Sequence, residues 1–507
     1  MASYFMGIDN GGTLTKAVIF DGRGRAAGSG ARKVPMLMPA PGHTERDMGA
    51  LWQANCAAIR EAIDKAGIDG KDIRGVACTG HGKGLYLWGK DGRPAHNGIV
   101  STDSRAWAYP PMWTRDGTVE KAFPRICQRV LACQPVSLLR WFKDNRPEVL
   151  QGVQWVFEVK DYVRFMLTGE AFAEVTDYSG SGLMNIRDAR FDRDLLELFG
   201  IGEVYDMLPP LAYSTESCGA VTPEAARATG LAAGTPVAAG MFDIDACAVA
   251  ADVTDEDNLC VIAGTWSINE YISRQPVLDG SVMMNSLFCI PGYYLVEESS
   301  PTSAGNNEWF TELFLQSEKS VAAERGMGIF DLTSEMAGSV APDAQDIVFL
   351  PHIYGSNDNP LARACFVGLQ ASHSREQIVR AVFEGIALGH RVHVERLLKS
   401  RSMPRAVRLA GGAAKSPVWT RIFADVLGLP IEVVEAEELG TLGCAMAAAV
   451  ASGEYKDLKE AAKNMVKIKG RIEPDGTFAA VYDRKFALHK EVSELLDGIW
   501  QRYAAGQ

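Results

Sequence analysis

The stretch YFMGIDNGGTLTK, residues 4–16, decides the fold class. An apolar run ends at Asp9, an Asn-Gly-Gly turn follows, and a second apolar run continues the chain, so the pattern predicts a β-hairpin. Glycines let main-chain N–H groups approach phosphate oxygens, and a carboxylate at a strand end suits Mg²⁺. An ordinary Asn-Gly hairpin turn has the same local pattern. The hydroxyl of Thr13 and the ammonium of Lys16, on the same stretch, favour a phosphate-binding turn.

A similar strand–turn–strand pattern returns about 250 residues later, at residues 258–272, with Gly264-Thr265 at its turn. A repeated supersecondary unit indicates two domains built on one plan. The length of 507 residues also exceeds what one hydrophobic core usually supports. We place the boundary between residues 246 and 258, which gives domains at 1–250 and 251–507.

Composition limits the class of partner. Hydrophobic residues make up 47% of the chain and charged residues 22%, as in ordinary globular proteins. The formal net charge of -12 argues against a nucleic-acid partner, which requires a basic face. The N-terminus lacks a signal-peptide pattern, and the strongest apolar stretch, residues 444–451, is too short to cross a bilayer. Ten dispersed cysteines without a CxxC pair fit a cytoplasmic protein with no membrane partner.

Two acids follow a buried-type strand in the stretch AGMFDIDA, residues 239–246. Helix capping alone would also select an acid at the position of Asp243 or Asp245. A glycine-rich stretch, AGGAAKS at residues 410–416, precedes an expected helix at 417–427. Its glycines could admit a nucleobase or ribose, and tight helix packing on small residues is the alternative.

Other patterns argue against further sites. The chain has no GxxxxGK[ST] loop and no protein-kinase motif. His390, His393 and Glu395 have ligand-like spacing on an expected helix at 377–398. Nothing supplies a further metal ligand, so we expect a surface or packing role for them. The remaining pattern predicts a helix at 48–66, a strand at 73–79, a strand at 85–88 and helical structure over 134–168.

The four stretches, in this order and spacing, resemble the FGGY family of carbohydrate kinases. The resemblance covers essentially the whole chain, with QPVSLLRW at 134–141, KDYVRFMLTG at 160–169 and TDYS at 176–179 as supporting stretches. It implies an α/β fold with two similar lobes of the actin, hexokinase and chaperone-ATPase type, which is ribonuclease H-like, and a cleft between them. The domains at 1–250 and 251–507 then become the sugar-binding and nucleotide-binding FGGY domains.

The resemblance also implies roles for individual residues. Asp243 matches the catalytic base, and Asp9 matches the metal-associated acid of the first phosphate turn. Residues that match the ATP-binding turns are Gly11, Gly12, Thr13, Lys16, Gly264, Thr265, Gly411, Gly412 and Ser416. Residues that match the sugar-facing loops are His81, Gly82, Asp103 and Arg105, together with Asp243 itself.

The resemblance implies ATP and Mg²⁺ as cofactors and a sugar hydroxyl as acceptor. The Gly-Lys-Gly at 82–84 and the Gly-Thr-Trp at 264–266 are similar to the L-xylulose kinase branch. L-Xylulose, phosphorylated to the 5-phosphate, is therefore the expected substrate. Glycerol, erythritol, D-xylulose and a keto-sugar acid remain alternatives, as does a regulatory ATPase of the same fold. Dimers are common in the family, so a homodimer is also an expectation.

Overall fold

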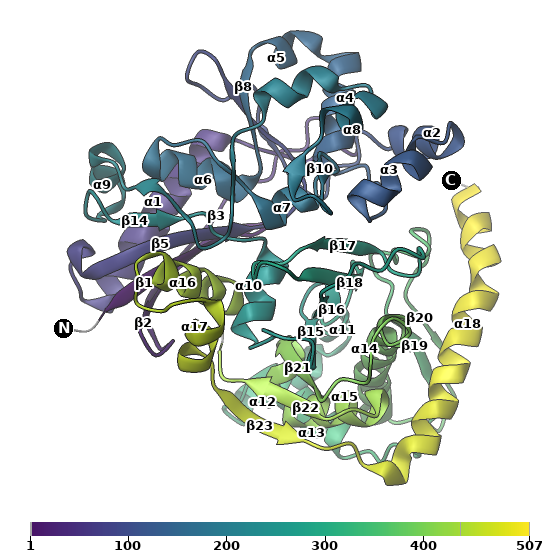
Figure 1. Ribbon diagram of the computed structural model, residues 1–507. Helices are drawn as coiled ribbons and strands as arrows, with labels where there is room; N and C mark the ends of the chain where they lie inside the picture. The colour runs from purple at the N-terminus through teal and green to yellow at the C-terminus, as the bar shows by residue number, and fades with distance from the viewer. Residues whose placement is uncertain (1–2, 437, 506–507) are drawn as a thin grey trace. The chain divides into compact units, whose positions relative to one another are not determined.

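The computed structural model describes residues 3–436 and 438–505 (Figure 1). The chain forms two compact units, and each is discontinuous in sequence. The first unit comprises Met1–Thr254, Ile272–Val296 and Ala436–Val466, and the second comprises Asp255–Tyr271, Glu297–Glu435 and Lys467–Gln507. Within the described residues, no helix combines the length and the apolar character needed to cross a membrane.

The first unit is built on a six-stranded sheet in the order β13-β14-β5-β1-β2-β3. Strand β1 pairs antiparallel with β2 and parallel with β5, so the predicted hairpin is confirmed and forms the middle of the sheet. The central strands are apolar along nearly their whole length, as expected where both faces are covered. The strands are β1 (Tyr4–Asn10), β2 (Leu14–Asp21), β3 (Ala26–Lys33), β5 (Ile73–Gly80), β13 (Ser217–Ala220) and β14 (Pro236–Ala238).

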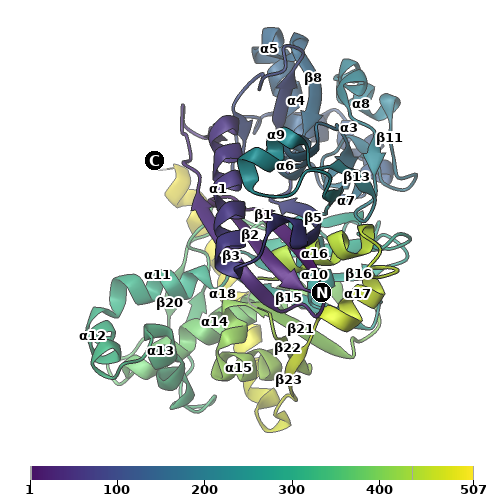
Figure 2. The same ribbon diagram turned by 90° about the vertical axis from the view of Figure 1, so that its left-hand side faces the viewer.

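Helices cover the two faces of this sheet. Side chains alternate along a strand, so Met6 and Ile8 of β1 face one side, where they share a core with α1 (Met48–Ala66), and Gly7 faces the other. On that second side lies α16 (Leu439–Ala451), so close that a Cβ on Gly7 would lie 1.8 Å from the carbonyl oxygen of Thr441 (Figure 2). The glycine- and alanine-rich sequence of α16 follows from this close packing on the sheet.

The rest of the first unit consists mainly of short helices and two-stranded sheets. The helices are α2 (Tyr109–Arg115), α3 (Thr118–Ile126), α4 (Pro135–Asn145), α5 (Pro147–Gln151), α6 (Val159–Thr168), α7 (Val175–Ser179), α8 (Arg193–Leu198), α9 (Pro223–Thr229), α10 (Asp243–Ala250) and α17 (Leu458–Met465). The short strands are β4 (Glu45–Arg46), β6 (Tyr86–Gly89), β7 (Gly98–Ile99), β8 (Val153–Phe157), β9 (Ala173–Glu174), β10 (Met184–Asn185), β11 (Arg190–Phe191), β12 (Leu211–Ala212) and β17 (Met284–Leu287).

The predicted helical stretch 134–168 is wrong in its middle. Strand β8 lies there, between helices α5 and α6, and pairs antiparallel with β6. Its sequence, VQWVF, combines β-branched and aromatic residues that pack well on a sheet. The helical pattern on either side obscured this short strand.

The second unit has a sheet with the strand order β16-β15-β21-β22-β23. Strand β15 pairs antiparallel with β16 and parallel with β21, which repeats the arrangement of β1 with β2 and β5. The strands are β15 (Asn258–Ala263), β16 (Ser267–Ser273), β19 (Val348–Leu350), β20 (Cys365–Val367), β21 (Ala406–Gly411), β22 (Ile431–Val434) and β23 (Ile468–Ile472). Strand β18 (Tyr294–Ser300) spans Val296–Glu297, where the chain passes from one unit to the other.

The helices of the second unit are α11 (Gly305–Phe314), α12 (Gln316–Glu324), α13 (Ile329–Gly338), α14 (Arg375–Leu397), α15 (Pro417–Leu427) and α18 (Ala479–Ala505). Both sheets thus combine an antiparallel hairpin with a parallel neighbour and carry helices against them. This is the predicted mixed α/β fold with two sheet-containing units of the actin and hexokinase type.

Candidate active site

Asp9 lies at the end of β1, opposite Lys16 in the register of the first hairpin. Its Oδ1 atom is buried and has no hydrogen-bond partner among the described residues. Burial raises the pKa of the carboxyl to about 6; Lys16 opposes this shift and Glu438 adds to it. A bound cation would stabilise the ionised form of such an acid and would supply a partner for its free oxygen.

Arg46 holds the turn that follows Asp9 in place. Arg46 is fully buried, and its guanidinium donates hydrogen bonds to the carbonyl oxygens of Gly11, at 3.2 Å, and of Gly12. Thr13 is exposed at the tip of the turn. Lys16 forms an ion pair with Glu438, with Nζ and Oε2 2.6 Å apart. The backbone of the predicted phosphate turn is therefore fixed through its carbonyl groups.

Asp243 is the first residue of α10, and the segment before it is held rigidly. Gly240 has a φ of 81°, and a Cβ there would lie 1.9 Å from the carbonyl oxygen of Cys78, so only glycine fits. Thr79 donates a hydrogen bond from its hydroxyl to the carbonyl oxygen of Met241, at 2.7 Å. The N–H group of Phe242 donates to Oγ1 of Thr176, at 2.9 Å. These contacts, from β5 and α7, place the start of α10.

Asp243 and its neighbour Asp245 differ in their exposure. Burial raises the pKa of Asp243 well above its usual value; Asp9 and Asp177 add to the shift, and Lys83 opposes it. Asp243 remains partly exposed. Asp245 is fully buried, and its Oδ1 accepts a hydrogen bond from the N–H group of Cys289, at 2.9 Å. Of the two acids, Asp243 is the one that a substrate can reach.

A buried cluster of charges lies behind the start of α10. The ammonium of Lys160 is fully buried and lies 3.2 to 3.3 Å from carboxylate oxygens of Asp161, Glu174 and Asp177. Although burial lowers the pKa of Lys160, these carboxylates raise it above its usual value, so the side chain stays charged. Glu174 also accepts a hydrogen bond from the hydroxyl of Thr176, at 2.7 Å, and thereby orients the group that holds Phe242.

The predicted sugar-facing residues fall into two groups. His81 is buried, with Nε2 3.1 Å from the hydroxyl of Tyr86, and burial lowers its pKa to about 3. Gly82 lies directly against the ring of Phe242, since a Cβ there would lie 2.2 Å from that ring. The loop that carries both residues is therefore adjacent to the segment that leads into α10.

Asp103 and Arg105 pair with each other. The guanidinium of Arg105 donates to both carboxylate oxygens of Asp103, at 2.8 to 3.1 Å, and to Glu45, at 2.8 Å. Asp103 also accepts from the N–H group of Thr44, at 2.7 Å. A bridge between Leu85 and Ile99 places the segment that leads to Asp103 beside the loop of His81. The structure therefore brings the two predicted loops together in the first unit.

The predicted residues of the second unit also meet. Gly411, with a φ of 86°, ends β21 beside the end of β15, because a Cβ there would lie 2.5 Å from the carbonyl oxygen of Ala263 and 2.9 Å from the nitrogen of Gly264. The Gly264-Thr265 turn and the Gly411-Gly412 turn thus lie side by side at one edge of the sheet. Thr265 is exposed there. Ser416 caps α15 by accepting a hydrogen bond from the N–H group of Trp419 at 3.1 Å.

Two family models match nearly the whole chain. The N-terminal domain of the FGGY family of carbohydrate kinases matches residues 4–250, and the C-terminal domain matches residues 259–452. The chain belongs to the FGGY family of carbohydrate kinases. It is therefore a sugar kinase, and the prediction from the sequence is confirmed at this level.

Curated relatives and solved structures agree with this family. The L-xylulose/3-keto-L-gulonate kinase of Escherichia coli strain K12 is 36% identical over 504 residues, which cover 99% of each chain. The autoinducer-2 kinase of Salmonella typhimurium is 27% identical and covers 98% of this chain and 96% of the relative. The crystal structure of xylulose kinase from Rhodospirillum rubrum is 26% identical, with a TM-score of 0.85 over 98% of this FGGY kinase and all of that chain.

Sequence reasoning missed two residues that shape this site. Arg46, which holds the first turn, is a single arginine in a polar stretch and belongs to no recognisable spacing. Lys83 was noted only within its Gly-Lys-Gly stretch, yet it is the cation that lowers the pKa of Asp243. Its backbone has a φ of 65°, and its N–H group donates to Glu158, at 3.1 Å. The flanking glycines were the available signal for an unusual backbone at this position.

Proposed function

We propose that this FGGY kinase transfers the terminal phosphoryl group of ATP to a hydroxyl of a keto-sugar, with L-xylulose as the preferred acceptor and the 5-phosphate as product. The full-length similarity to a relative named for L-xylulose and 3-keto-L-gulonate carries this proposal. A second relative, the probable L-xylulose kinase of Pasteurella multocida, supports the same acceptor. The keto-sugar acid in the first relative's name is the second candidate acceptor.

In this proposal Asp243 is the general base that accepts the proton of the attacking hydroxyl. A base is most effective when its pKa lies near the working pH. The raised pKa of Asp243 moves the carboxyl in that direction. Its place at the start of α10, held through Gly240 and Phe242, fixes the direction of attack.

Mg²⁺ and ATP are the cofactors of the proposal. Mg²⁺, when bound, neutralises charge on the phosphates of the nucleotide. Asp9 is the residue that would hold the ion, and its unpartnered Oδ1 and raised pKa fit this role. Phosphate contacts in the first unit are assigned to the turn at Gly11, Gly12 and Thr13, with Lys16 beside it.

Nucleotide contacts in the second unit are assigned to the two adjacent turns, at Gly264-Thr265 and Gly411-Gly412. Main-chain N–H groups at such glycine turns bind phosphate without added cationic side chains. Ser416 caps α15, so we assign it to positioning the glycine-rich stretch that leads into this helix. Sugar contacts are assigned to His81, Gly82, Asp103 and Arg105 in the first unit.

An assay of ADP release tests the acceptor. The panel is L-xylulose, D-xylulose, 3-keto-L-gulonate, glycerol, erythritol and a reaction without sugar, each read as kcat/KM. The proposal expects the largest value for L-xylulose and little release without an acceptor. Equal release with and without sugars would instead indicate a regulatory ATPase, and a largest value for glycerol or erythritol would indicate a polyol kinase.

We also propose a cytoplasmic location, no nucleic-acid partner and a homodimer. The acidic net charge of -12 supports the absence of a nucleic-acid partner. Light scattering coupled to gel filtration measures the assembly, and a mass of one chain would contradict the dimer.

A further inference from the structure

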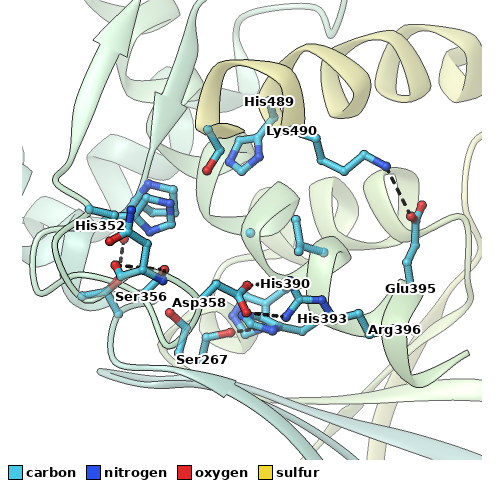
Figure 3. A pocket seen from close by; sticks show the side chains of 18 of the residues that line it. Ser267, His352, Ser356, Asp358, His390, His393, Glu395, Arg396, His489 and Lys490 are labelled. Atoms are coloured by element: carbon cyan, nitrogen blue, oxygen red, sulfur yellow. Dashed lines mark hydrogen bonds and ion pairs between the residues drawn. The ribbon is translucent and has the colours of Figure 1, made fainter. Parts of the chain in front are cut away.

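A cavity of about 350 Å³ lies in the second unit, between α14, α18 and the loop at residues 352–362 (Figure 3). It is within the range of about 300 to 1,000 Å³ that small-molecule sites usually occupy. Four of the eight histidines of the chain line it: His352, His390, His393 and His489. The proposed sugar and nucleotide contacts involve none of them.

Two of these histidines have structural partners. Nδ1 of His390 lies 2.7 Å from Oδ1 of Asn269, and its Nε2 lies 2.7 Å from the hydroxyl of Ser303. Nδ1 of His393 lies 3.2 Å from a carboxylate oxygen of Glu298. The packing role predicted for His390 and His393 is therefore supported by their contacts. These two side chains form part of the fixed floor of the cavity.

The other two histidines have buried ring nitrogens without a hydrogen-bond partner among the described residues. His489 is only 2% exposed, and neither of its ring nitrogens has a hydrogen-bond partner among the described residues. Nδ1 of His352 is buried and equally unpartnered within the described part of the chain. An unpaired buried polar group costs free energy that a native protein usually avoids. Figure 3 shows the His489 side chain on α18 and the His352 side chain on the loop, on neighbouring parts of the cavity wall.

The protonation of these rings limits the class of ligand. Burial lowers the pKa of His489 to about 3 and that of His352 to about 4, so both imidazoles are neutral near pH 7. A neutral imidazole offers one N–H donor and one bare nitrogen acceptor. A hydroxyl group, which both donates and accepts, matches this pair of requirements. A fully deprotonated anion supplies only acceptors, and a metal ion pairs only with the bare nitrogens.

Two ion pairs lie in the wall of the cavity. Arg396 contacts Asp358 at 2.5 Å and 3.0 Å, and Lys490 lies 3.9 Å from Glu395. Within the described residues, no group of three or more His, Cys, Asp or Glu side chains is arranged to hold a metal ion. We propose that this cavity binds a neutral polyhydroxylated small molecule, a free sugar or polyol, through hydroxyl groups that pair with His489 and His352.

Replacing His489 by phenylalanine tests the unpaired nitrogens without changing the size of the ring much. Because the nitrogens have no partner, His489→Phe is expected to keep or raise the Tm of the ligand-free protein. His390→Phe, in the same cavity, is the matched control and should lower the Tm, because it removes a ring with two satisfied nitrogens. A Tm of His489→Phe that falls as far as that of His390→Phe would show that His489 is already satisfied, and would overturn the proposal.

Binding is measured by calorimetric titration of the full chain with xylitol, inorganic phosphate and Zn²⁺ as separate probes. The wild type should bind one more equivalent of xylitol than His489→Phe, and xylitol should shift the ¹³C-labelled ring signals of His489 and His352. Equal xylitol binding by the two proteins would mean that the cavity holds only water and would refute the proposal. Loss of phosphate or Zn²⁺ binding in His489→Phe, with xylitol unaffected, would assign an ionic ligand and would equally refute it. Neither result depends on which acceptor the kinase phosphorylates.

Discussion

Replacing Asp9 by asparagine should stabilise this kinase above pH 6 while abolishing its proposed metal contact. The carboxyl of Asp9 has an Oδ1 without a partner among the described residues, and burial raises its pKa from 3.8 to about 6. The native state therefore keeps this proton to a higher pH than the unfolded chain does. Between about pH 4 and pH 6 the native state binds more protons than the unfolded state, so stability falls as the pH rises.

The size of the loss in stability follows from the shift in the pKa of Asp9. A change of about 2 pKa units corresponds to about 3 kcal/mol, all of it lost once the pH passes 6. Asparagine carries no charge and does not suffer this loss. Asp9→Asn also removes a negative charge that raises the pKa of Asp243, which adds to stability in the same direction. For a unit of roughly 300 residues, 3 kcal/mol corresponds to an increase in Tm of about 5 °C.

Differential scanning calorimetry of both proteins from pH 4 to pH 8, without nucleotide or divalent ions, measures the difference. The Tm of Asp9→Asn should match the wild type near pH 4 and exceed it by about 5 °C at pH 7.5. Asp21→Asn is the control, because the pKa of Asp21 is shifted in the opposite direction. Burial raises this pKa, but hydrogen bonds from Arg25 and Arg23 outweigh the effect of burial and lower the pKa overall. That variant should lose stability at pH 7.5. A Tm of Asp9→Asn at or below the wild type at pH 7.5 would refute the reasoning.

Three further substitutions test the proposed base and the residues that hold it in place. Asp243→Asn should lower kcat by about 10² to 10⁴ while calorimetric ADP binding stays near wild type, and unchanged turnover would exclude Asp243 as the base. Gly240→Ala should unfold at lower temperature and lose activity, because its Cβ would lie 1.9 Å from a carbonyl oxygen. Gly234 is the control, because it has a φ of 88° but no atom within 4 Å of an added Cβ. Gly234→Ala should therefore lower the Tm much less. Lys160→Met should destabilise the first unit by about 3 to 5 kcal/mol in urea unfolding, because it leaves buried carboxylates uncompensated, whereas Lys319→Met, which removes an ion pair at the surface, should change little.

The parts of the fold that depend on local pattern could be predicted from the sequence. The first hairpin follows from an apolar run, a glycine turn and a second apolar run, and α1 matches its expected bounds of 48–66. Both are determined by residues close together in the chain. Strand β8 could not be predicted in the same way, because its five residues pair with β6, more than sixty residues earlier. A short strand depends on its distant partner as much as on its own residues.

The return of residues 436–466 to the first unit was also beyond local reasoning. Helix α16 packs on Gly7 of β1, and a Cβ on Gly443 would lie 2.3 Å from the carbonyl oxygen of Ala246 in α10. The glycines of α16 are therefore required for close packing against a strand and a helix far away in sequence. The sequence shows only that small residues recur there.

The choice between Asp243 and Asp245 shows why a motif does not by itself identify a base. The two acids stand two residues apart at the start of one helix, and capping would select either of them. Their environments differ: Asp245 is closed off and bonded to the N–H group of Cys289, whereas Asp243 stays partly open beside Asp9 and Lys83. Those environments are built by residues far away in the chain, so the acid–base properties of each carboxyl depend on its surroundings as much as on its own place in the motif. A substitution of Lys83 by methionine should therefore raise the pKa of Asp243 further and move the acidic limb of the kcat–pH profile to higher pH, although the proposed base is unchanged.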